Sequence, residues 1–413
     1  MKKNDTAEAA AQTAADIKKA AEVTEAGGTA VELKDIWQAK DRLAGLVHKT
    51  SLSRSRSLDE ITGGEVFLKL ENMQKTGSFK VRGASNRILA LAGDSDIKGV
   101  IAASAGNHAQ GVALAATRAG IKSTIVMPEG APISKIMATR GYGAEVVLSG
   151  ANYDEAWRRA MELQKEQGTL FLHAYDDPYV IAGQGTIGLE IMEQMSELDT
   201  VLVPVGGGGL AAGVSLAVKS LNPKVKVIGV EAANRGHTIA DGIQVKHPGK
   251  ITGAILDKYL DGMVKVDDEE VAGTILMLLE RVKVVTEGAG AASVAAALYQ
   301  KVPTQGRKLA CIVSGGNVDV NFVAQIIQRG MLKNGRYREV TAAIGDKPGS
   351  LRRYLDIIAK EKGNVINVIH DRNRADLPIS TVSVSVLIET QGFEHGEQIL
   401  KALRQGGITL LKW

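Results

Sequence analysis

The sequence predicts an α/β protein with two parallel sheets, followed by a small domain with an antiparallel sheet. From residue 65 to residue 329, apolar strand-like runs alternate with segments of helical periodicity. This alternation is typical of parallel sheets covered by helices. After residue 335 the order becomes strand, helix, strand, strand, helix, strand, which is the ferredoxin-like arrangement. A chain of 413 residues has room for two or three such units.

Composition and charge exclude several classes of protein. The chain is 45% hydrophobic and 23% charged, which is ordinary for a globular protein with a large core. Its net charge is only +4 and no basic stripe is interleaved with aromatics, so we expect no nucleic-acid partner. Cys311 is the single cysteine, which excludes a disulfide framework. We find no membrane-spanning run and no secretory signal, and therefore expect a cytoplasmic protein without a membrane partner.

The elements of the large part follow from periodicity. Residues 1–30 are rich in alanine and offer little to bury, which predicts a mobile tail. Residues 31–47 have amphipathic helical spacing, and residues 65–70 alternate as a strand. Further strands are predicted at residues 99–103, 123–127, 144–148, 170–173, 201–205, 226–231 and 309–313. Further helices are predicted at residues 81–92, 109–119, 133–142, 153–167, 183–195, 210–221, 272–283, 290–300 and 320–329.

The last part of the chain has a different pattern. Its strands alternate as half-buried strands do, and its two helices lie between them. The strands are predicted at residues 338–344, 365–372, 380–389 and 408–412, and the helices at 349–361 and 395–405. We therefore predict a large domain at residues 31–332, with a smaller subdomain inserted at roughly 72–178, and a separate domain at 338–413.

The turn around Lys80 is the first candidate site. The sequence Lys75-Thr-Gly-Ser-Phe-Lys-Val-Arg-Gly-Ala84 places this lysine behind a glycine turn and at the start of a predicted helix. The positive end of a helix dipole disfavours a cation, so such a lysine can be a nucleophile with a lowered pKa. An ordinary surface lysine at a helix start remains the alternative.

A second turn joins an apolar strand to a helix with four consecutive glycines, Gly206 to Gly209. Without Cβ atoms the backbone can wrap an anion with its N–H groups, and a phosphate fits best. A nucleotide P-loop is excluded because no Gly-Lys-Ser/Thr follows. A dinucleotide fold would need an acidic residue after the next strand, and Glu231 is the only candidate.

Two further turns carry hydroxyl and amide side chains at helix starts. In Ser104-Ala-Gly-Asn-His108 these groups can hold a carboxylate and a ring hydroxyl, whereas the histidine is more often a packed helix residue. Ser314, in Ser314-Gly-Gly-Asn317, can face a ring nitrogen or simply cap the next helix. Glu287 opens another glycine turn, and it is either a carboxylate near a ring edge or an acid favourable to a helix dipole.

Together these motifs resemble the threonine/serine dehydratases. The resemblance rests on Gly77-Ser-Phe-Lys-Val-Arg-Gly-Ala84, Ser104 to His108, Gly206 to Leu210, and Ser314 to Asn317, which occur in the family's order. It covers about residues 31–332 and implies the tryptophan-synthase-β-like fold of fold-type II pyridoxal phosphate (PLP) enzymes. The last domain, with Gly345-Asp-Lys-Pro-Gly-Ser-Leu351 after its first strand, resembles an ACT regulatory domain.

The resemblance implies a role for each matching residue. Lys80 would carry PLP and take the Cα proton, and Phe79 would pack near the ring. Asn107 would bind the ring hydroxyl, and Ser314 would face the pyridine nitrogen, where a neutral group suits β-elimination. The phosphate would be held by Gly206, Gly207, Gly208, Gly209 and Leu210. The substrate carboxylate would be held by Ser104, Ala105, Gly106, Asn107 and His108, with Ser104 also counted as catalytic.

The activity implied is threonine ammonia-lyase, which converts threonine to 2-oxobutanoate and ammonia, with serine as a secondary substrate. Serine dehydratase or racemase, and a non-catalytic amino-acid sensor, are the alternatives. Racemases of this family carry a second serine where this chain has Ala105, so racemisation is disfavoured. Their cation site needs an acid where this chain has His237, so no metal is expected. The ACT domain implies a homodimer or homotetramer regulated by isoleucine, valine or a nucleotide.

Overall fold

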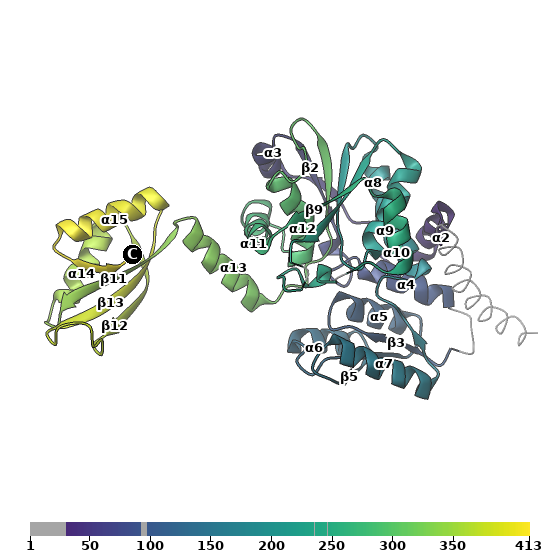
Figure 1. The fold of residues 1–413 in the computed structure, drawn as a ribbon, viewed down its shortest axis with the longest axis horizontal. Helices are drawn as coiled ribbons and strands as arrows, with labels where there is room; N and C mark the ends of the chain where they lie inside the picture. Colours follow the sequence, from purple (N-terminus) through teal and green to yellow (C-terminus); the bar gives the residue numbers. More distant parts are fainter. Residues whose placement is uncertain (1–29, 92–96, 235, 246) are drawn as a thin grey trace, which may run out of the picture. The chain divides into compact units, whose positions relative to one another are not determined.

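The computed structural model describes residues 30–91, 97–234, 236–245 and 247–413. These residues divide into two compact units, the first ending at Asp319 and the second spanning Val320–Trp413 (Figure 1). The tail predicted at residues 1–30 lies outside the described residues except for Ala30, which packs against the core of the first unit. The domain boundaries given above, and the inserted subdomain at 72–178, stay predictions.

The larger sheet of the first unit has six strands in the order β1, β2, β10, β7, β8, β9. All neighbours are parallel except β1, which runs antiparallel to β2 at one edge. Every residue of β7 is buried, because helices cover both faces of a central parallel strand, and this explains its continuous apolar run. The strands are β1 Leu52–Arg54, β2 Glu65–Leu70, β7 Thr200–Pro204, β8 Lys226–Ala232, β9 Gly262–Val266 and β10 Lys308–Val313.

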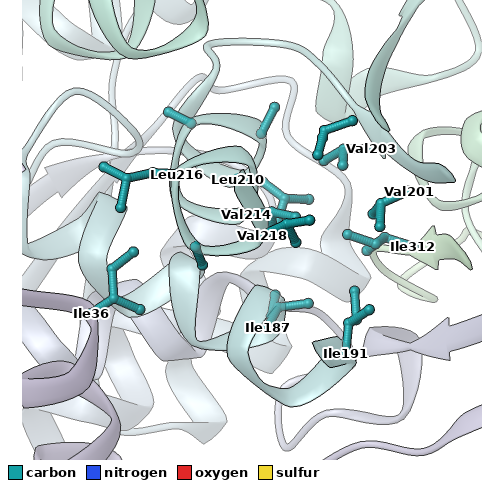
Figure 2. Close-up of a cluster of buried hydrophobic side chains, with 14 of the residues drawn as sticks. Ile36, Ile187, Ile191, Val201, Val203, Leu210, Val214, Leu216, Val218 and Ile312 are labelled. Carbon is teal, nitrogen blue, oxygen red and sulfur yellow. The ribbon is translucent and has the colours of Figure 1, made fainter. Parts of the chain in front are cut away.

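The core of this sheet lies against α2, α8 and α9. Figure 2 shows Ile36 of α2 and Ile187 of α8 on the helical side, and Val201 and Ile312 on the strand side. Helices α8 and α9 approach closely because Gly213 carries no side chain, and a Cβ there would lie 2.4 Å from the carbonyl oxygen of Ile181. The helices are α2 Leu33–Leu43, α3 Arg56–Thr62, α8 Pro178–Gln194, α9 Gly209–Leu221, α10 Lys250–Tyr259, α11 Asp268–Met277 and α12 Gly288–Leu298, with short turns η1 Glu71–Met73, η2 Asp241–Ile243 and η3 Leu278–Val282.

The smaller sheet has four parallel strands in the order β5, β4, β3, β6. Successive residues of a strand point to opposite faces, so Val100 and Ala102 of β3 pack with α4 and α5, whereas Ile101 and Ala103 pack with α7. Two parallel sheets were predicted, and the structure confirms them. The elements are β3 Val100–Ala103, β4 Ser123–Met127, β5 Glu145–Leu148, β6 Leu170–Phe171, α4 Lys80–Leu91, α5 Asn107–Arg118, α6 Ile133–Gly141 and α7 Tyr153–Gln167.

The start of α8 differs from the prediction. The helix expected at residues 183–195 begins at Pro178. The Asp177 carboxylate accepts hydrogen bonds from the N–H groups of Tyr179 and Val180, at 2.8 and 3.0 Å. An aspartate cap followed by proline is a strong helix-start signal. Gly185 and Gly188 of this helix allow the close packing with α9, since a Cβ at either position would lie 3.0 Å from a backbone oxygen of α9.

Other elements were missed or misplaced. Helix α5 starts at Asn107, so the turn predicted at residues 104–108 is shorter and its last two residues are helical. Helices α3 and α10 and strand β9 were not predicted. The first turn of α10 is capped by Asp176, whose carboxylate accepts from the N–H groups of Ile251 and Thr252 at 3.0 Å. A cap supplied from more than seventy residues away leaves no local signal in the sequence.

The second unit begins with α13, which was predicted as the last helix of the large domain, and from β11 onward it has the predicted strand and helix order. Its antiparallel sheet is ordered β12, β13, β11, β14, and the helices α14 and α15 pack on one face through residues such as Tyr354 and Leu403. The Tyr354 hydroxyl donates to the carbonyl of Val340 at 3.0 Å. The elements are α13 Val320–Lys333, β11 Tyr337–Gly345, α14 Ser350–Lys360, β12 Asn364–Asp371, β13 Thr381–Glu389, α15 Phe393–Gln405 and β14 Thr409–Lys412. Among the described helices of both units, none is long and apolar enough to cross a membrane.

Candidate active site

The lysine turn and the turn after β10 are joined by backbone contacts. Ser78 and Gly315 form an isolated antiparallel bridge. The Phe79 N–H donates to the carbonyl of Ser314 at 3.1 Å, and the Gly316 N–H donates to the carbonyl of Gly77 at 2.8 Å. Two motifs that are more than two hundred residues apart in the sequence therefore meet at the carboxyl edge of the larger sheet, where ligands of open parallel sheets bind.

Lys80 is the first residue of α4 and is half-buried. Its Nζ donates to the carbonyl of Ala174 at 2.8 Å and lies 5.3 Å from the ring centre of Phe79. Burial lowers the pKa of this amine to about 8, although the charge of Glu287 opposes the shift. An amine with this pKa is a nucleophile and a base over an accessible pH range.

The four-glycine loop joins β7 to α9. Gly208 is the residue before the helix, has φ +92°, and supplies no side-chain cap. A Cβ at Gly206 would lie 2.9 Å from the Cα of Ile243, and a Cβ at Gly207 would lie 2.4 Å from the Tyr175 ring. Only glycine therefore fits at these two positions, and the first N–H groups of α9 have no side-chain cap, which is the arrangement that binds anions at helix starts.

A segment that sequence reasoning missed packs against this loop. Residues 172–177 join β6 to α8, and they supply the Ala174 carbonyl to Lys80 and the Tyr175 ring to Gly207. The Asp176 cap fixes α10, whose Thr252 hydroxyl donates to the Gly207 carbonyl at 2.8 Å. The available signal was the Asp177-Pro178 helix start, which marks a turn after a strand end.

Asn107 begins α5 and lies between two partners. Its Nδ2 donates to Glu287 Oε1 at 2.7 Å, and its Oδ1 accepts from Asn317 Nδ2 at 2.7 Å. Gly106 precedes the helix and provides no side-chain cap, so the N–H groups of the first turn are available to a carboxylate. The Ser104 hydroxyl accepts from the Gly106 N–H at 3.3 Å.

His108 is a packed helix residue. It is 4% exposed, and its Nε2 lies 2.9 Å from the carbonyl oxygen of Leu172. Burial, with a further contribution from the charge of Lys80, lowers the pKa of this imidazole to about 3. A histidine with such a pKa stays neutral at physiological pH, so it does not exchange protons as a catalytic base would.

Glu287 precedes α12, but it does not cap the helix with its side chain. The carboxylate turns toward Asn107 instead. Burial raises its pKa to about 7, while the hydrogen bond from Asn107 and the charge of Lys135 lower it. Asp241 raises this pKa further, and it forms an ion pair with Lys135 at 3.6 Å. The interpretation as a site carboxylate agrees better with this geometry than the helix-dipole alternative.

A buried charge cluster lies beneath the lysine helix and was not anticipated. We define it as Lys69, Glu71, Arg82 and Glu190. The Arg82 guanidinium lies 2.7 Å from an oxygen of each glutamate, and Lys69 Nζ lies 2.6 Å from Glu190. All four side chains are buried. The cluster connects β2, α4 and α8, and it therefore fixes the start of α4 relative to the larger sheet.

Glu231, the acid considered above for a dinucleotide fold, lies in β8 and forms an ion pair with Lys265 at 3.5 Å. Within the described ranges, no group of three or more His, Cys, Asp or Glu side chains is placed to hold a metal ion.

Comparison with known proteins identifies the family. A profile described as "Pyridoxal-phosphate dependent enzyme" matches residues 43–315, more than half of the chain. This chain belongs to the pyridoxal-phosphate dependent enzymes. The L-threonine ammonia-lyase of Thermotoga maritima is 49% identical over 390 residues, which cover 90% of this chain and 97% of that protein. The catabolic L-threonine dehydratase TdcB of Escherichia coli is 47% identical over 315 residues, which cover 72% of this chain and 96% of that protein.

A solved structure supports the same assignment. Maize serine racemase has a TM-score of 0.69 and 36% identity, with 73% of this chain and 98% of that chain covered. The resemblance to the fold-type II PLP enzymes is confirmed. The T. maritima match is longer than the first unit of this chain, so it extends into the second unit. The antiparallel sheet of that unit agrees with the predicted ACT domain.

The residues present fit the cofactor of this pyridoxal-phosphate dependent enzyme. PLP carries an aldehyde, a phosphate, a ring oxygen and a ring nitrogen, and each has a matching group. The amine of Lys80 is held at a lowered pKa, and the glycine loop leaves an uncapped helix start where a Cβ would collide. Asn107 offers an amide N–H, and Ser314 is brought beside the lysine turn.

Proposed function

We propose that this enzyme converts L-threonine to 2-oxobutanoate and ammonia by β-elimination, with L-serine as a secondary substrate. The observation that carries the proposal is the meeting of the predicted motifs around the Lys80 amine, whose pKa is about 8. The similarity to the T. maritima L-threonine ammonia-lyase over 90% of this chain supports threonine as the main substrate.

Each cofactor group has a proposed partner. Lys80 holds the cofactor, Phe79 packs beside it, and Ser314 faces the ring nitrogen. The Asn107 amide donates to the ring oxygen. The phosphate is held by the N–H groups of Gly206, Gly207, Gly208, Gly209 and Leu210. When bound, PLP withdraws electrons from the Cα of an attached amino acid.

The remaining steps belong to side chains of this protein. The Lys80 amine takes the Cα proton, and the Ala174 carbonyl, 2.8 Å away, holds this amine in place. A positioned base of this kind contributes a rate factor of about 10²–10⁴. The substrate carboxylate binds at the start of α5, to the Ser104 hydroxyl and the N–H groups of residues 105–108. In this proposal His108 contributes only its backbone, because its ring is packed against Leu172.

Ala105 favours elimination over racemisation. A racemase needs a proton donor on the face of Cα opposite the lysine, and the alanine methyl group cannot supply one. Kinetic constants for L-threonine and L-serine, together with chiral analysis for D-serine, test this proposal. We expect a higher kcat/KM for threonine, formation of 2-oxobutanoate, and no D-serine. A higher kcat/KM for serine, or accumulation of D-serine, would replace the proposal with a serine dehydratase or a racemase.

The variant Ala105→Ser sharpens this test. It adds a hydroxyl at the position in question, and the alanine is half-buried with space around the neighbouring Gly106. We expect D-serine to appear in this variant while threonine elimination persists at a reduced rate. Ala113→Ser, in α5 and buried in the core of the smaller sheet, is the matched control and should leave the product unchanged.

We further propose that the second unit regulates the enzyme as an ACT domain within a cytoplasmic homodimer or homotetramer. Its sheet order and the two helices packed on one face of the sheet, α14 and α15, support this role. A thermal-shift screen with isoleucine, valine, AMP and ADP, combined with activity assays, identifies the effector, because a ligand that binds the folded state raises Tm. If none of these compounds changes either Tm or activity, the regulatory role is not supported. An intact protein that binds PLP but does not turn over threonine or serine would favour a non-catalytic sensor.

A further inference from the structure

Asn317 is the neighbour of Asn107 that the proposed function does not use. It lies three residues after Ser314, in the turn that follows β10. A carboxamide has a donor side and an acceptor side, so its orientation decides what it offers to a ligand. The groups around Asn107 therefore determine whether its N–H or its carbonyl oxygen faces the cofactor.

The orientation of Asn317 is fixed by a group that can only accept. Its Nδ2 donates to the backbone carbonyl of Thr76 at 2.7 Å. A backbone carbonyl has no proton to give, so the NH₂ side of Asn317 must face it. The same NH₂ group donates its other proton to Asn107 Oδ1 at 2.7 Å. The carbonyl oxygen of Asn107 is consequently turned toward Asn317, and its NH₂ group points the other way.

Glu287 alone would not fix this orientation. It accepts from Asn107 Nδ2 at 2.7 Å, but its raised pKa of about 7 means that it is partly protonated near neutral pH. A protonated carboxyl group can donate as well as accept, so it could pair with either side of an amide. Lys80, Lys135 and Asp241 are the other charged groups that influence this carboxyl. Asn317, held by a backbone carbonyl, does not change with pH.

The glycines of two motifs make room for this arrangement. A Cβ at Gly77, in the lysine turn, would lie 2.3 Å from Asn317 Oδ1. A Cβ at Gly315 would lie 2.4 Å from Glu287 Oε1 and 3.2 Å from Asn107 Nδ2. We call the hydrogen-bonded side chains of Asn317 and Asn107 the amide chain. It lies where the lysine turn, the Ser314 turn and the start of α5 come together. Its position agrees with a role in the site and not only in packing.

We propose that Asn317 is a positioning residue, which holds the Asn107 carboxamide with its NH₂ group toward the ring oxygen of PLP. One N–H of Asn107 binds Glu287 and the other remains for the cofactor. Without Asn317 the amide can rotate by half a turn and present an oxygen to an oxygen, which is repulsive. This inference rests on the proposed function, in which Asn107 binds the ring oxygen.

A double-mutant cycle in the full-length holoenzyme tests the inference. Asn317→Ala and Asn107→Ala should each weaken PLP binding by about two- to tenfold, the value of one hydrogen bond. The double variant should bind PLP no more weakly than Asn107→Ala, because Asn317 acts through Asn107. If the two effects on the PLP dissociation constant add, Asn317 acts by another route and the inference is wrong.

A second variant keeps the test sharp if the alanine variant does not fold. Asn317→Asp preserves size but cannot donate to Asn107. We expect the pH midpoint of the visible absorbance of the bound cofactor to move in the same direction as in Asn107→Ala. An unchanged midpoint and unchanged PLP affinity would overturn the inference.

Ser293→Ala is the matched control. It removes a buried hydrogen bond of 2.8 Å to the carbonyl of Ile312 in β10, away from the amide chain, so it should lower Tm without changing the midpoint. A control that moved the midpoint equally would show a purely structural effect and reject the role of Asn317. A wild-type chain that binds no PLP would reject the proposed function itself, whereas additive effects in a PLP-binding chain reject only this inference.

Discussion

Lys69 and Lys80 lie eleven residues apart, and they differ in burial and in the partners of their amines. Lys69 is fully buried, whereas Lys80 is half-buried. Lys69 Nζ lies 2.6 Å from Glu190, 2.7 Å from the Thr50 carbonyl and 3.1 Å from Gln194. Lys80 Nζ donates to a single carbonyl, that of Ala174. Burial lowers the pKa of both amines, but an adjacent carboxylate opposes this shift at Lys69 far more directly than at Lys80.

The difference in partners gives Lys69 a structural role and leaves Lys80 reactive. Lys69 belongs to the buried cluster with Glu71, Arg82 and Glu190, where each charge has an opposite charge within 3 Å. Such a lysine stays charged and contributes to the geometry of the fold. Lys80 lacks a partner of this kind, so its amine can lose its proton near physiological pH. One short stretch of sequence thus supplies both a rigid structural support and a reactive amine. Substitutions in the support should change stability more than activity, and substitution of the reactive amine should change activity more than stability.

The largest effect should come from Lys80→Ala. We expect loss of the visible absorbance of the lysine-bound cofactor and a fall in kcat of at least about 10³-fold, because both the cofactor attachment and the Cα base are removed. Tm of the apoprotein should not fall, since a poorly paired amine leaves the interior. Spectra, steady-state kinetics and a thermal melt measure these three quantities. Turnover that survives the substitution would contradict the proposed role of Lys80.

Arg82→Met should have the next largest effect, on stability. Removing this guanidinium leaves two buried carboxylates, of which Glu71 loses its ion pair at 2.7 Å and keeps only the charge interaction with Lys69. Breaking a buried ion network in this way costs about 3–5 kcal/mol. The free energy of unfolding in denaturant measures the cost. The folded fraction of the variant should bind PLP with a nearly unchanged absorbance spectrum. A variant as stable as the wild type would mean that the cluster is not a support.

These two residues also show what could be predicted from sequence. Lys80 was found because its glycine turn, strand and helix are all local features. Its lowered pKa could be argued from the helix start, but the Ala174 carbonyl could not, since it comes from a segment almost one hundred residues later. Arg82 lies within the same motif, yet its partner Glu190 lies in a helix whose start was predicted five residues too late. Pairing over such distances is a property of the folded chain.

The same division applies to the other motifs. The four-glycine loop and most strands were predicted because glycine runs and apolar runs are written in consecutive residues. Helix α10 was not predicted, because its cap is Asp176 and its position depends on the loop it supports. The alternatives at Glu287 could not be decided from sequence, since its side chain is directed by Asn107 and not by its own helix.

A smaller effect is expected in the pH dependence of apoprotein stability. Glu287 has a pKa raised from 4.5 to about 7, so the folded state keeps a proton that the unfolded state has lost. The free energy of unfolding should therefore fall as the pH rises from about 5 to 7. Lys80 has a pKa lowered from 10.5 to about 8, which makes stability rise between about pH 8 and 10. Denaturation at a series of pH values measures both slopes.

The variants Glu287→Gln and Lys80→Met separate the two contributions. The first should flatten the slope between about pH 5 and 7, and the second should flatten the slope above about pH 8, each leaving the other slope in place. If Glu287→Gln leaves the lower slope unchanged, the burial of this carboxyl is weaker than its geometry indicates.

The smallest effect should come from Lys69→Met, and it tests the comparison most directly. Removing Lys69 also breaks a buried charge pair, but Glu190 keeps Arg82 at 2.7 Å, so no carboxylate is left without a cation. The lost interactions are hydrogen bonds to neutral groups and one shared ion pair, while the methionine gains apolar burial. We expect a change in unfolding free energy of no more than about 1–2 kcal/mol, with PLP spectra and kcat close to those of the wild type.

A loss of stability as large as that of Arg82→Met would show that Lys69 and Arg82 are equally needed. A loss of cofactor absorbance would show that cofactor binding at Lys80 depends on the charge of Lys69. The structural role of the buried charge cluster and the reactivity of Lys80 would then not be independent.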